Sequence, residues 1–243
     1  MSEQLLQVRG LSVRFPQRGV GLFGAQRWLT AVDGVDLDVV SGQSVGIVGE
    51  SGCGKSTLAR AILGLVKPAA GSIAWRGAPV RVGDASGLRR MRRELQVVFQ
   101  DPVGSLDPRM TIGESVAEAL VALEGPQSRA TRESRVAATL GEVGLDVVLA
   151  RRYPHELSGG QCQRAAIARA IVARPRLLVC DEAVSALDVS VQAQIVNLLA
   201  ELRERHGLAL LFISHNLAVV RHLSDEVVVL YLGRVVERAP RES

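Results

Sequence analysis

The segment GESGCGKST, residues 49–57, constrains the fold of this chain more than any other feature. It fits the pattern GxxxxGK[ST], in which the amides of a glycine-rich loop surround nucleotide phosphates. That chemistry needs a buried strand before the loop and a helix after it, because free amides at a helix N-terminus face the phosphates. A mostly apolar run at 44–48 and an amphipathic run at 56–66 meet both needs. The expected apolar face of the helix consists of Leu58, Ala61, Ile62 and Leu65.

Lysine usage supports the same interpretation. The chain has 29 Lys plus Arg, yet only Lys55 and Lys67 are lysines. A compact ammonium fits the crowded phosphate position better than a broad guanidinium does. We therefore expect Lys55 to neutralise the β and γ phosphates and the Ser56 hydroxyl to hold Mg²⁺. The predicted nucleotide-binding residues of this loop are Gly49, Glu50, Ser51, Gly52, Cys53, Gly54, Lys55, Ser56 and Thr57.

A pair of carboxylates follows a second apolar run. Residues 177–180 read as a buried parallel strand, and Asp181 and Glu182 stand at its carboxyl end. Neighbouring residues of a strand point in different directions, so the two side chains can have two roles. Asp181 is expected in the magnesium shell, and Glu182 at the water that attacks the γ phosphate. Seen alone, the pair could also be a surface acidic pair that closes a strand.

Three further features are weak individually. Gln100 is the last residue of a predicted strand at 95–100, after VVF, and could be a solvated loop residue. His215 follows an apolar run and could be a capped or core histidine. The segment LSGGQ, residues 157–161, opens a helical pattern at 161–173, for which Ser158 is a suitable N-cap. A serine, two glycines and a helix N-terminus form an anion site. The chain thus offers two phosphate-facing surfaces that are far apart in sequence.

The ordered set of motifs resembles the nucleotide-binding subunit of an ABC transporter, over about residues 5–237. The resemblance implies that 49–57 is the Walker A loop, 157–161 the signature and 185–188 the D-loop. It also implies that ATP lies between the Walker A loop of one subunit and the signature of its partner. The implied catalytic residues are Glu182 of the Walker B pair, the switch histidine His215 and the Q-loop residue Gln100.

The resemblance assigns ligand contacts as well. It implies that Mg²⁺ is held by Ser56, Gln100 and Asp181, and that an aromatic residue near the first strand, here Phe15, stacks on adenine. The signature residues implied to contact ATP are Ser158, Gly159, Gly160 and Gln161.

The fold expected from the motifs and the resemblance is α/β, a P-loop NTPase core of the ABC ATPase type. An antiparallel β subdomain and an inserted helical subdomain accompany the core in one domain, residues 1–243. We expect 5–100 and 165–237 to form the core and 101–164 to form the helical lobe with the signature. Two amphipathic helices are predicted in the lobe, at 111–124 and 129–143, and a surface loop is predicted at 16–28.

The amino-acid sequence between the motifs resembles that of the ATPases of bacterial dipeptide, oligopeptide and nickel importers, above all at 99–120 and 181–199. Peptide import is the favoured function, with nickel import and a non-transport ABC ATPase of a phosphonate-degrading complex as alternatives. A soluble nucleotide-hydrolysing regulator is disfavoured because it has no use for LSGGQ. Longer relatives continue beyond position 243, so this is a short form or a fragment. Departures from the family pattern are Cys162, Ala183 and Asn216.

Composition agrees with a subunit on the cytoplasmic face of the cell membrane. No apolar run approaches the roughly 18 residues needed to span a bilayer, and no signal peptide is visible. Three separated cysteines argue against a disulfide framework. The net charge of +4 is spread out, and the arginine cluster at 89–93 lacks aromatics for base stacking, so no nucleic acid is expected. The expected partners are membrane permease subunits, a paralogous ATPase subunit or a second copy, and an external solute-binding protein.

Overall fold

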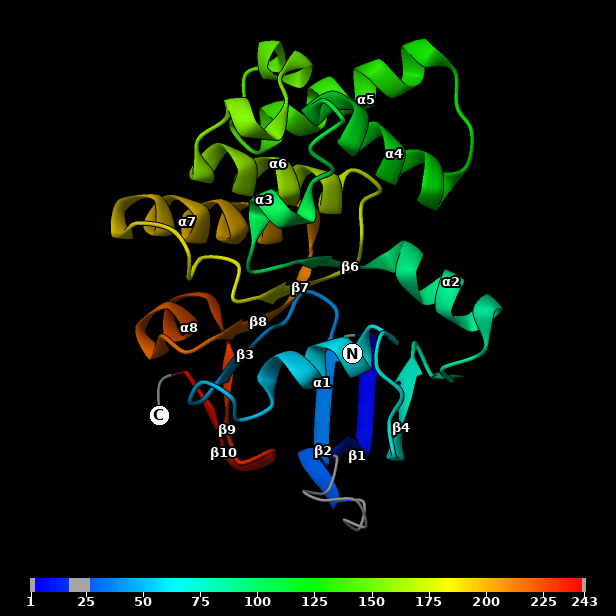
Figure 1. Cartoon of the computed structure of the whole chain (residues 1–243), viewed down its shortest axis with the longest axis vertical. Coiled ribbons are helices and arrows are strands. Elements are labelled where there is room, and N and C mark those ends of the chain that lie inside the picture. Colours follow the sequence, from blue (N-terminus) through cyan, green and yellow to red (C-terminus); the bar gives the residue numbers. More distant parts are fainter. Residues whose placement is uncertain (1–2, 18–26, 242–243) are drawn as a thin grey trace, which may run out of the picture.

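Two β-sheets and a layer of helices build the molecule (Figure 1). The computed structural model describes residues 3–17 and 27–241. The smaller sheet is antiparallel in the order β2-β1-β4-β5. In β2 the burial alternates from Val35 to Val39, which is typical of a strand that covers a core with one face and meets solvent with the other. The strands are β1 (Gln4–Gln17), β2 (Arg27–Val40), β4 (Ala70–Trp75) and β5 (Ala78–Val80).

The larger sheet has the order β10-β9-β3-β8-β7-β6, and all neighbours are parallel except the edge strand β10. Every residue of β3, β7 and β8 is buried, as expected for parallel strands covered on both faces. The predicted strands at 44–48 and 177–180 are confirmed. The strands are β3 (Ser44–Val48), β6 (Leu95–Val98), β7 (Leu177–Asp181), β8 (Ala209–Ser214), β9 (Glu226–Tyr231) and β10 (Arg234–Pro240).

The two faces of the larger sheet belong to two different hydrophobic cores. Along β7, Leu177 and Val179 pack into the core that contains α1, whereas Leu178 and Cys180 pack into the core that contains α4, α6 and α7. Figure 1 shows α1 on one side of the sheet and α6 and α7 on the other. The helices are α1 (Lys55–Ile62), α2 (Ala85–Glu94), α3 (Pro102–Ser105), α4 (Ile112–Glu124), α5 (Arg129–Glu142), α6 (Gly159–Ile171), α7 (Val189–His206) and α8 (Leu217–Leu223), with 3₁₀ turns η1 (Val147–Arg151) and η2 (Pro154–Glu156).

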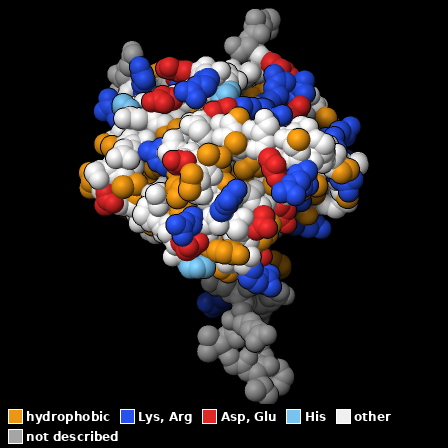
Figure 2. All heavy atoms as spheres, turned by 90° about the horizontal axis from the view of Figure 1, so that it is seen from above, with side chains coloured by type: hydrophobic (Ala, Val, Ile, Leu, Met, Phe, Trp, Pro, Cys, Tyr) orange, Lys and Arg blue, Asp and Glu red, His pale blue; other side chains and the backbone are white. Residues whose placement is uncertain are grey.

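The helical layer contains α3 to α6 and lies above the parallel sheet (Figure 1). The two predicted helices are confirmed as α4 and α5, which begin after the N-caps Thr111 and Ser128. The predicted domain boundary at 164/165 falls inside α6, so the division into 101–164 and a core stays a prediction. Figure 2, which views the molecule from above, shows positive and negative side chains interspersed over this face.

Two local predictions were wrong in part. The helix predicted to 66 ends at Ile62, because Leu63 is its C-cap and Gly64 has a φ of +67°; Leu65 is therefore 55% exposed rather than buried. The loop predicted at 16–28 is shorter, because β1 and β2 still pair Pro16 with Trp28. The rest of that loop, 18–26, lies outside the described residues.

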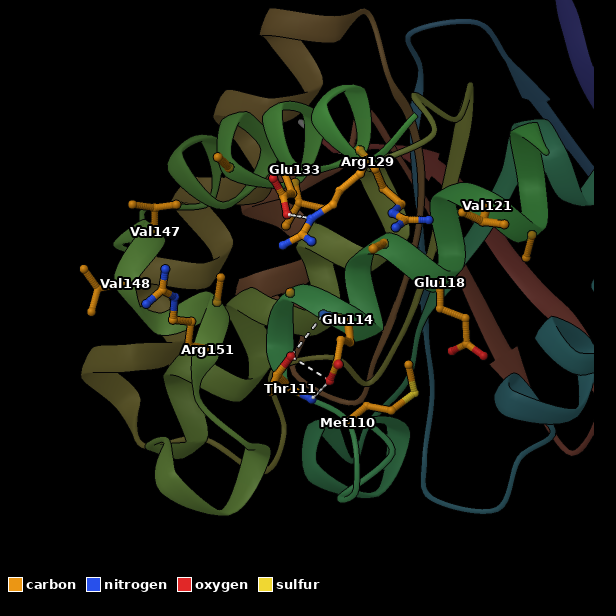
Figure 3. Close-up of a pocket in the computed structure, with 17 residues that line it drawn as sticks. Met110, Thr111, Glu114, Glu118, Val121, Arg129, Glu133, Val147, Val148 and Arg151 are labelled. Carbon is orange, nitrogen blue, oxygen red and sulfur yellow. Dashed lines mark hydrogen bonds and ion pairs between the residues drawn. The ribbon is translucent and has the colours of Figure 1, made fainter. Parts of the chain in front are cut away.

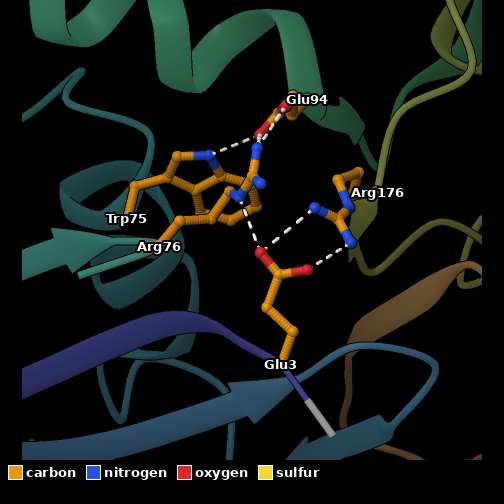
Figure 4. Close-up of polar contacts among 5 residues, drawn as sticks. All are labelled: Glu3, Trp75, Arg76, Glu94 and Arg176. Atoms are coloured by element: carbon orange, nitrogen blue, oxygen red, sulfur yellow. Dashed lines mark hydrogen bonds and ion pairs between the residues drawn. The ribbon is translucent and has the colours of Figure 1, made fainter. Parts of the chain in front are cut away.

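Four charged residues and a tryptophan connect the two sheets (Figure 4). The Glu3 carboxylate, just before β1, accepts from Arg76 Nε at 2.8 Å and from Arg176 Nη2 at 2.6 Å. Glu94 accepts from Arg76 Nη1 and from Trp75 Nε1, each at 2.9 Å. The Arg176 and Arg76 hydrogen bonds lower the pKa of Glu3. Exposed pairs of this kind contribute little individually, so the network mainly orients the sheets.

A second ionic contact connects the helical layer to the core. Glu142 at the end of α5 accepts from Arg174, which precedes β7, and lies 3.1 Å from His206 Nε2 at the end of α7. The hydrogen bond from Arg174 lowers the pKa of Glu142. A lowered carboxyl pKa stabilises the folded state above the unfolded pKa, and this stabilisation is lost as the pH falls through the folded pKa.

We expect Glu142→Gln to lower the free energy of unfolding at pH 7 by about 1 kcal/mol, because it removes the ionised acceptor. The difference from the unsubstituted protein should close as the pH falls through the folded pKa of Glu142. Urea titrations at several pH values measure both effects. The control is Glu133→Gln, which removes only the exposed contact with Arg129. An equal loss in both variants would contradict the prediction.

Candidate functional site

The loop between β3 and α1 holds a buried ammonium group. Lys55 is 3% exposed, and its Nζ donates to the carbonyl oxygens of Gly49 and Glu50, each at 2.8 Å. Its third contact is the Sγ atom of Cys53 at 3.9 Å, a weak acceptor. All three partners are neutral, so the charge of Lys55 is held out of water without a hydrogen-bonded carboxylate. An anion at the mouth of the loop would compensate it.

Close backbone contacts explain two of the loop glycines. A Cβ on Gly54 would lie 2.2 Å from the carbonyl oxygen of Ala31 on β2, and one on Gly49 would lie 2.2 Å from that of Leu230 on β9. Gly54 also has a φ of +108°, a conformation that L-residues rarely adopt. The loop therefore lies between the two sheets.

A turn near the end of the chain supports the loop, and sequence reasoning missed it. The amide of Gly233, between β9 and β10, donates to the carbonyl oxygen of Cys53 at 2.8 Å. The amide of Asp33 on β2 donates to the carbonyl oxygen of Gly233, also at 2.8 Å. The glycine of the YLGRVVE segment was the only signal of this contact in the sequence.

Asp181, the last residue of β7, lies beside the loop. Its Oδ1 accepts from Ser56 Oγ at 2.9 Å, and the residue is 4% exposed. Burial raises the pKa of Asp181, against the opposing effects of the Ser56 hydrogen bond and the Arg60 charge. A hydroxyl and a buried carboxylate are hard oxygen donors of the kind that Mg²⁺ prefers, so these two residues fit that ion.

The structure also brings Glu182 and His215 together, at the ends of β7 and β8. His215 Nδ1 lies 3.5 Å from Glu182 Oε2. Glu182 has a φ of +50°, an unfavourable conformation for a non-glycine residue, and its amide donates to the carbonyl oxygen of Ile213 at 2.9 Å. The histidine is exposed, so the pair lies at the surface.

The LSGGQ segment forms the start of α6, as predicted, although the helix begins at Gly159. Ser158 is the N-cap: its Oγ accepts from the Gln161 amide at 3.3 Å, and the Gln161 side chain accepts from the Ser158 amide at 2.9 Å. Ser158 and Gly159 are exposed. A Cβ on Gly160 would lie 2.7 Å from Val191 on α7. Since α1 and α6 cover opposite faces of the sheet, this surface and the phosphate loop stay separate.

The two remaining predicted residues, Gln100 and Phe15, are both exposed. Gln100 is exposed, two residues after the end of β6. Phe15 on β1 is 38% exposed rather than core. It pairs with Leu29, two residues from Ala31, whose carbonyl approaches Gly54. The register thus places Phe15 opposite the part of β2 that leads to the loop.

The three departures from the family pattern have local structural explanations. Cys162 is buried and donates to the carbonyl oxygen of Pro154 at 3.3 Å, and burial raises its pKa. Ala183 is 1% exposed, so it packs in the core beside Glu182. Asn216 caps α8 by accepting from the Ala218 amide at 3.0 Å.

A separate groove of about 1080 Å³ lies in the helical layer, between α4, α5 and η1 (Figure 3). Val121, Val136 and Val147 line it, and charged residues such as Glu114 and Arg151 surround them. None of the phosphate-loop residues lines this groove. Within the ranges that the structure describes, no helix is long and apolar enough to cross a bilayer, and no three His, Cys, Asp or Glu side chains cluster as a metal site.

The fold and the site define a phosphate-loop ATPase, and comparison with known proteins identifies the family. A family model described as ABC transporter matches residues 32–185. The chain is 52% identical over 235 residues to the oligopeptide transport ATP-binding protein OppF of Salmonella typhimurium, covering 96% of this chain and 70% of that protein. It is 48% identical over 241 residues to the glutathione import ATP-binding protein GsiA of Pectobacterium atrosepticum, covering 99% and 38%.

Solved structures with a similar fold also come from ABC proteins. The dimeric ATP-binding cassette MJ0796 in a post-hydrolysis state with ADP and Pi has a TM-score of 0.86 at 28% identity, covering 98% of this chain and all of that one. The structure of cbiO1 from Clostridium perfringens, part of an ABC transporter complex, has a TM-score of 0.83 at 27% identity, covering 99% and 90%. This chain belongs to the ABC transporter family and is an ATP-hydrolysing subunit.

The contacts of Gly54 yield a stability prediction. Gly54→Ala should destabilise the protein more than Gly52→Ala, by at least about 1 kcal/mol. Both glycines have positive φ, but a Cβ on Gly52 meets nothing within 4 Å. The comparison therefore isolates the clash with Ala31. Free energies of unfolding from urea titrations of the two variants measure the difference, and equal values would contradict the predicted close approach.

Proposed function

We propose that this chain drives the uptake of di- and oligopeptides by hydrolysing ATP at the cytoplasmic face of the cell membrane. The observation that carries the chemistry is the convergence of Lys55, Ser56, Asp181, Glu182 and His215 at the carboxyl ends of three adjacent parallel strands. The cargo rests on the similarity to relatives named for oligopeptide transport and glutathione import.

Residues 49–57 bind the phosphates of ATP, with Lys55 paired to the β and γ groups and Phe15 stacked on adenine. Ser56, Asp181 and Gln100 would hold Mg²⁺, which when bound would neutralise phosphate charge. The raised pKa of Asp181 supports this role, because a nearby cation would favour the ionised form that burial disfavours.

Glu182 orients the attacking water and accepts its proton as the bond from the γ phosphorus to the bridging oxygen breaks. The products are ADP and phosphate. His215, within 3.5 Å of Glu182, orients this carboxylate and contacts the γ phosphate. Asp181 contacts Ser56 whereas Glu182 contacts His215, so the proposed base and the proposed magnesium ligand have different partners.

The signature completes the site of a second subunit. Ser158, Gly159, Gly160 and Gln161 offer an exposed helix N-terminus to the γ phosphate bound by the partner. The partner is a paralogous ATPase subunit or a second copy of this chain. The likeness to a dimeric cassette supports two subunits.

The helical lobe, 101–164, contacts the membrane permease subunits. The groove between α4, α5 and η1 supports this assignment, because it joins an apolar floor to a charged rim and stays apart from the nucleotide residues (Figure 3). A permease helix would bury Val147 and Val148, which are 53% and 65% exposed. The external solute-binding protein acts through the permeases.

Glu182→Gln should stop turnover while leaving ATP binding intact, because the amide keeps the size of the side chain but cannot accept the proton. General-base removal lowers rates by about 10²–10⁴-fold. The variant should form an ATP-dependent dimer, with itself or with its paralogue, that persists in gel filtration. Normal turnover would exclude Glu182 as the base.

Ser158→Arg should abolish hydrolysis while the same subunit still binds ATP, because its own phosphate loop is unchanged. A bulky guanidinium would obstruct the phosphate held by the opposite subunit. Calorimetry measures ATP binding, and phosphate release measures turnover. Lys55→Ala is the matched control, which should lose ATP binding itself. If Ser158→Arg also loses ATP binding, the split-site assignment fails.

Deletion of the gene should abolish growth on a required di- or oligopeptide and leave a nickel-dependent enzyme active in low-nickel medium. The external binding protein should still capture its peptide, because only translocation is lost. The Glu182→Gln chain should fail to restore growth, whereas the unsubstituted chain should succeed. Normal peptide uptake with lost nickel accumulation would favour the nickel importer instead.

A further inference from the structure

The short helix α3 follows Gln100 directly, and its two ends are held by side chains. At its start, Asp101 Oδ1 accepts from the Gly104 amide at 2.9 Å. At its end, Arg169 Nη1 donates to the carbonyl oxygen of Ser105. A single turn of four residues is unstable alone, so its location depends on such contacts.

The surroundings of Arg169 suit it to hold the end of α3. It extends from α6, and burial lowers the pKa of its guanidinium, against the effect of Glu118 on α4. An arginine nevertheless remains charged. A cation at the end of a helix stabilises the free carbonyl groups there. Leu106, which follows Ser105 in the sequence, is 2% exposed and anchors the end of α3 in the core.

The exposed side chain of Gln100 can reach a ligand only where the backbone on either side places it. Before it, β6 is fixed by parallel pairing with β7. After it, α3 is fixed by Asp101 and Arg169. We propose that Arg169 is a positioning residue, which holds α3 so that Gln100 reaches the magnesium ion of the bound nucleotide. This inference rests on the metal-binding role proposed for Gln100.

The same helix offers a matched control. Arg164 Nη1 donates to the carbonyl oxygen of Val143, the C-cap of α5, at 2.6 Å, and its Nη2 contacts Gln194 at 3.3 Å. Arg164 thus also joins α6 to a helix end, but that of α5 rather than that of α3. Loss of either arginine loosens the helical layer, whereas only the loss of Arg169 frees α3.

The test measures the affinity for Mn²⁺ by electron paramagnetic resonance, with saturating non-hydrolysable ATP analogue. We expect Arg169→Met to raise the Kd for Mn²⁺ about tenfold, the low end for residues that orient metal ligands. Arg164→Met should leave it unchanged, although both variants lower the melting temperature. Nucleotide affinity measured in EDTA should be the same in all variants. If Arg169→Met does not fold, Arg169→Lys should still raise the Kd, because its amine has no fork. The rise should be smaller than that expected for Met, because lysine keeps a positive charge and a donor.

Gln100→Ala separates the two hypotheses. If this variant binds Mn²⁺ as the unsubstituted protein does, the role of Gln100 is wrong and the inference falls with it. If Gln100→Ala raises the Kd and the Arg169 variant does not, only the inference is overturned. An equal rise in the Arg164 and Arg169 variants would also overturn it, because it would indicate general loosening.

Discussion

The parallel pairing of β3, β8 and β7 is the constraint on which the site depends. In this register Val48 lies beside Ser214, and Asp181 lies beside Ile213, so the three strands end together. The residues that follow each strand therefore meet at one edge of the sheet. Were one strand displaced by a residue, its buried side chains would exchange faces between two filled cores. Packing thereby protects the geometry of the proposed catalytic residues.

The charges at this edge are arranged for a ligand rather than for stability. Lys55 is buried among neutral acceptors, and Asp181 is buried so far that its pKa rises. Each opposes folding, because a desolvated charge without a full partner is unfavourable. Bound ATP and Mg²⁺ would supply the missing countercharges, so ligand binding and the stability of the native state are linked.

The division of the molecule by its parallel sheet has a functional consequence. The phosphate loop begins α1 on one face, and Ser158 begins α6 on the other. The two proposed half-sites thus begin helices on opposite sides of the sheet, and this separation agrees with the proposal that ATP is bound between subunits. Contacts between the helical layer and the core, such as that of Glu142 with Arg174, then help to set how the two surfaces are related.

The sequence by itself determined the phosphate loop, its flanking strand and helix, the acidic pair and the cap at Ser158. Each is a local pattern whose chemistry needs neighbours within a few residues. Only the tertiary structure showed that Gly233 supports the loop, that His215 meets Glu182, and that Arg169 holds the segment after Gln100. Those contacts join residues far apart in the chain, and their partners are backbone carbonyl groups or single side chains that leave no periodic pattern. The order and register of the strands bring these residues together, and both follow from the packing of the whole sheet rather than from any local pattern.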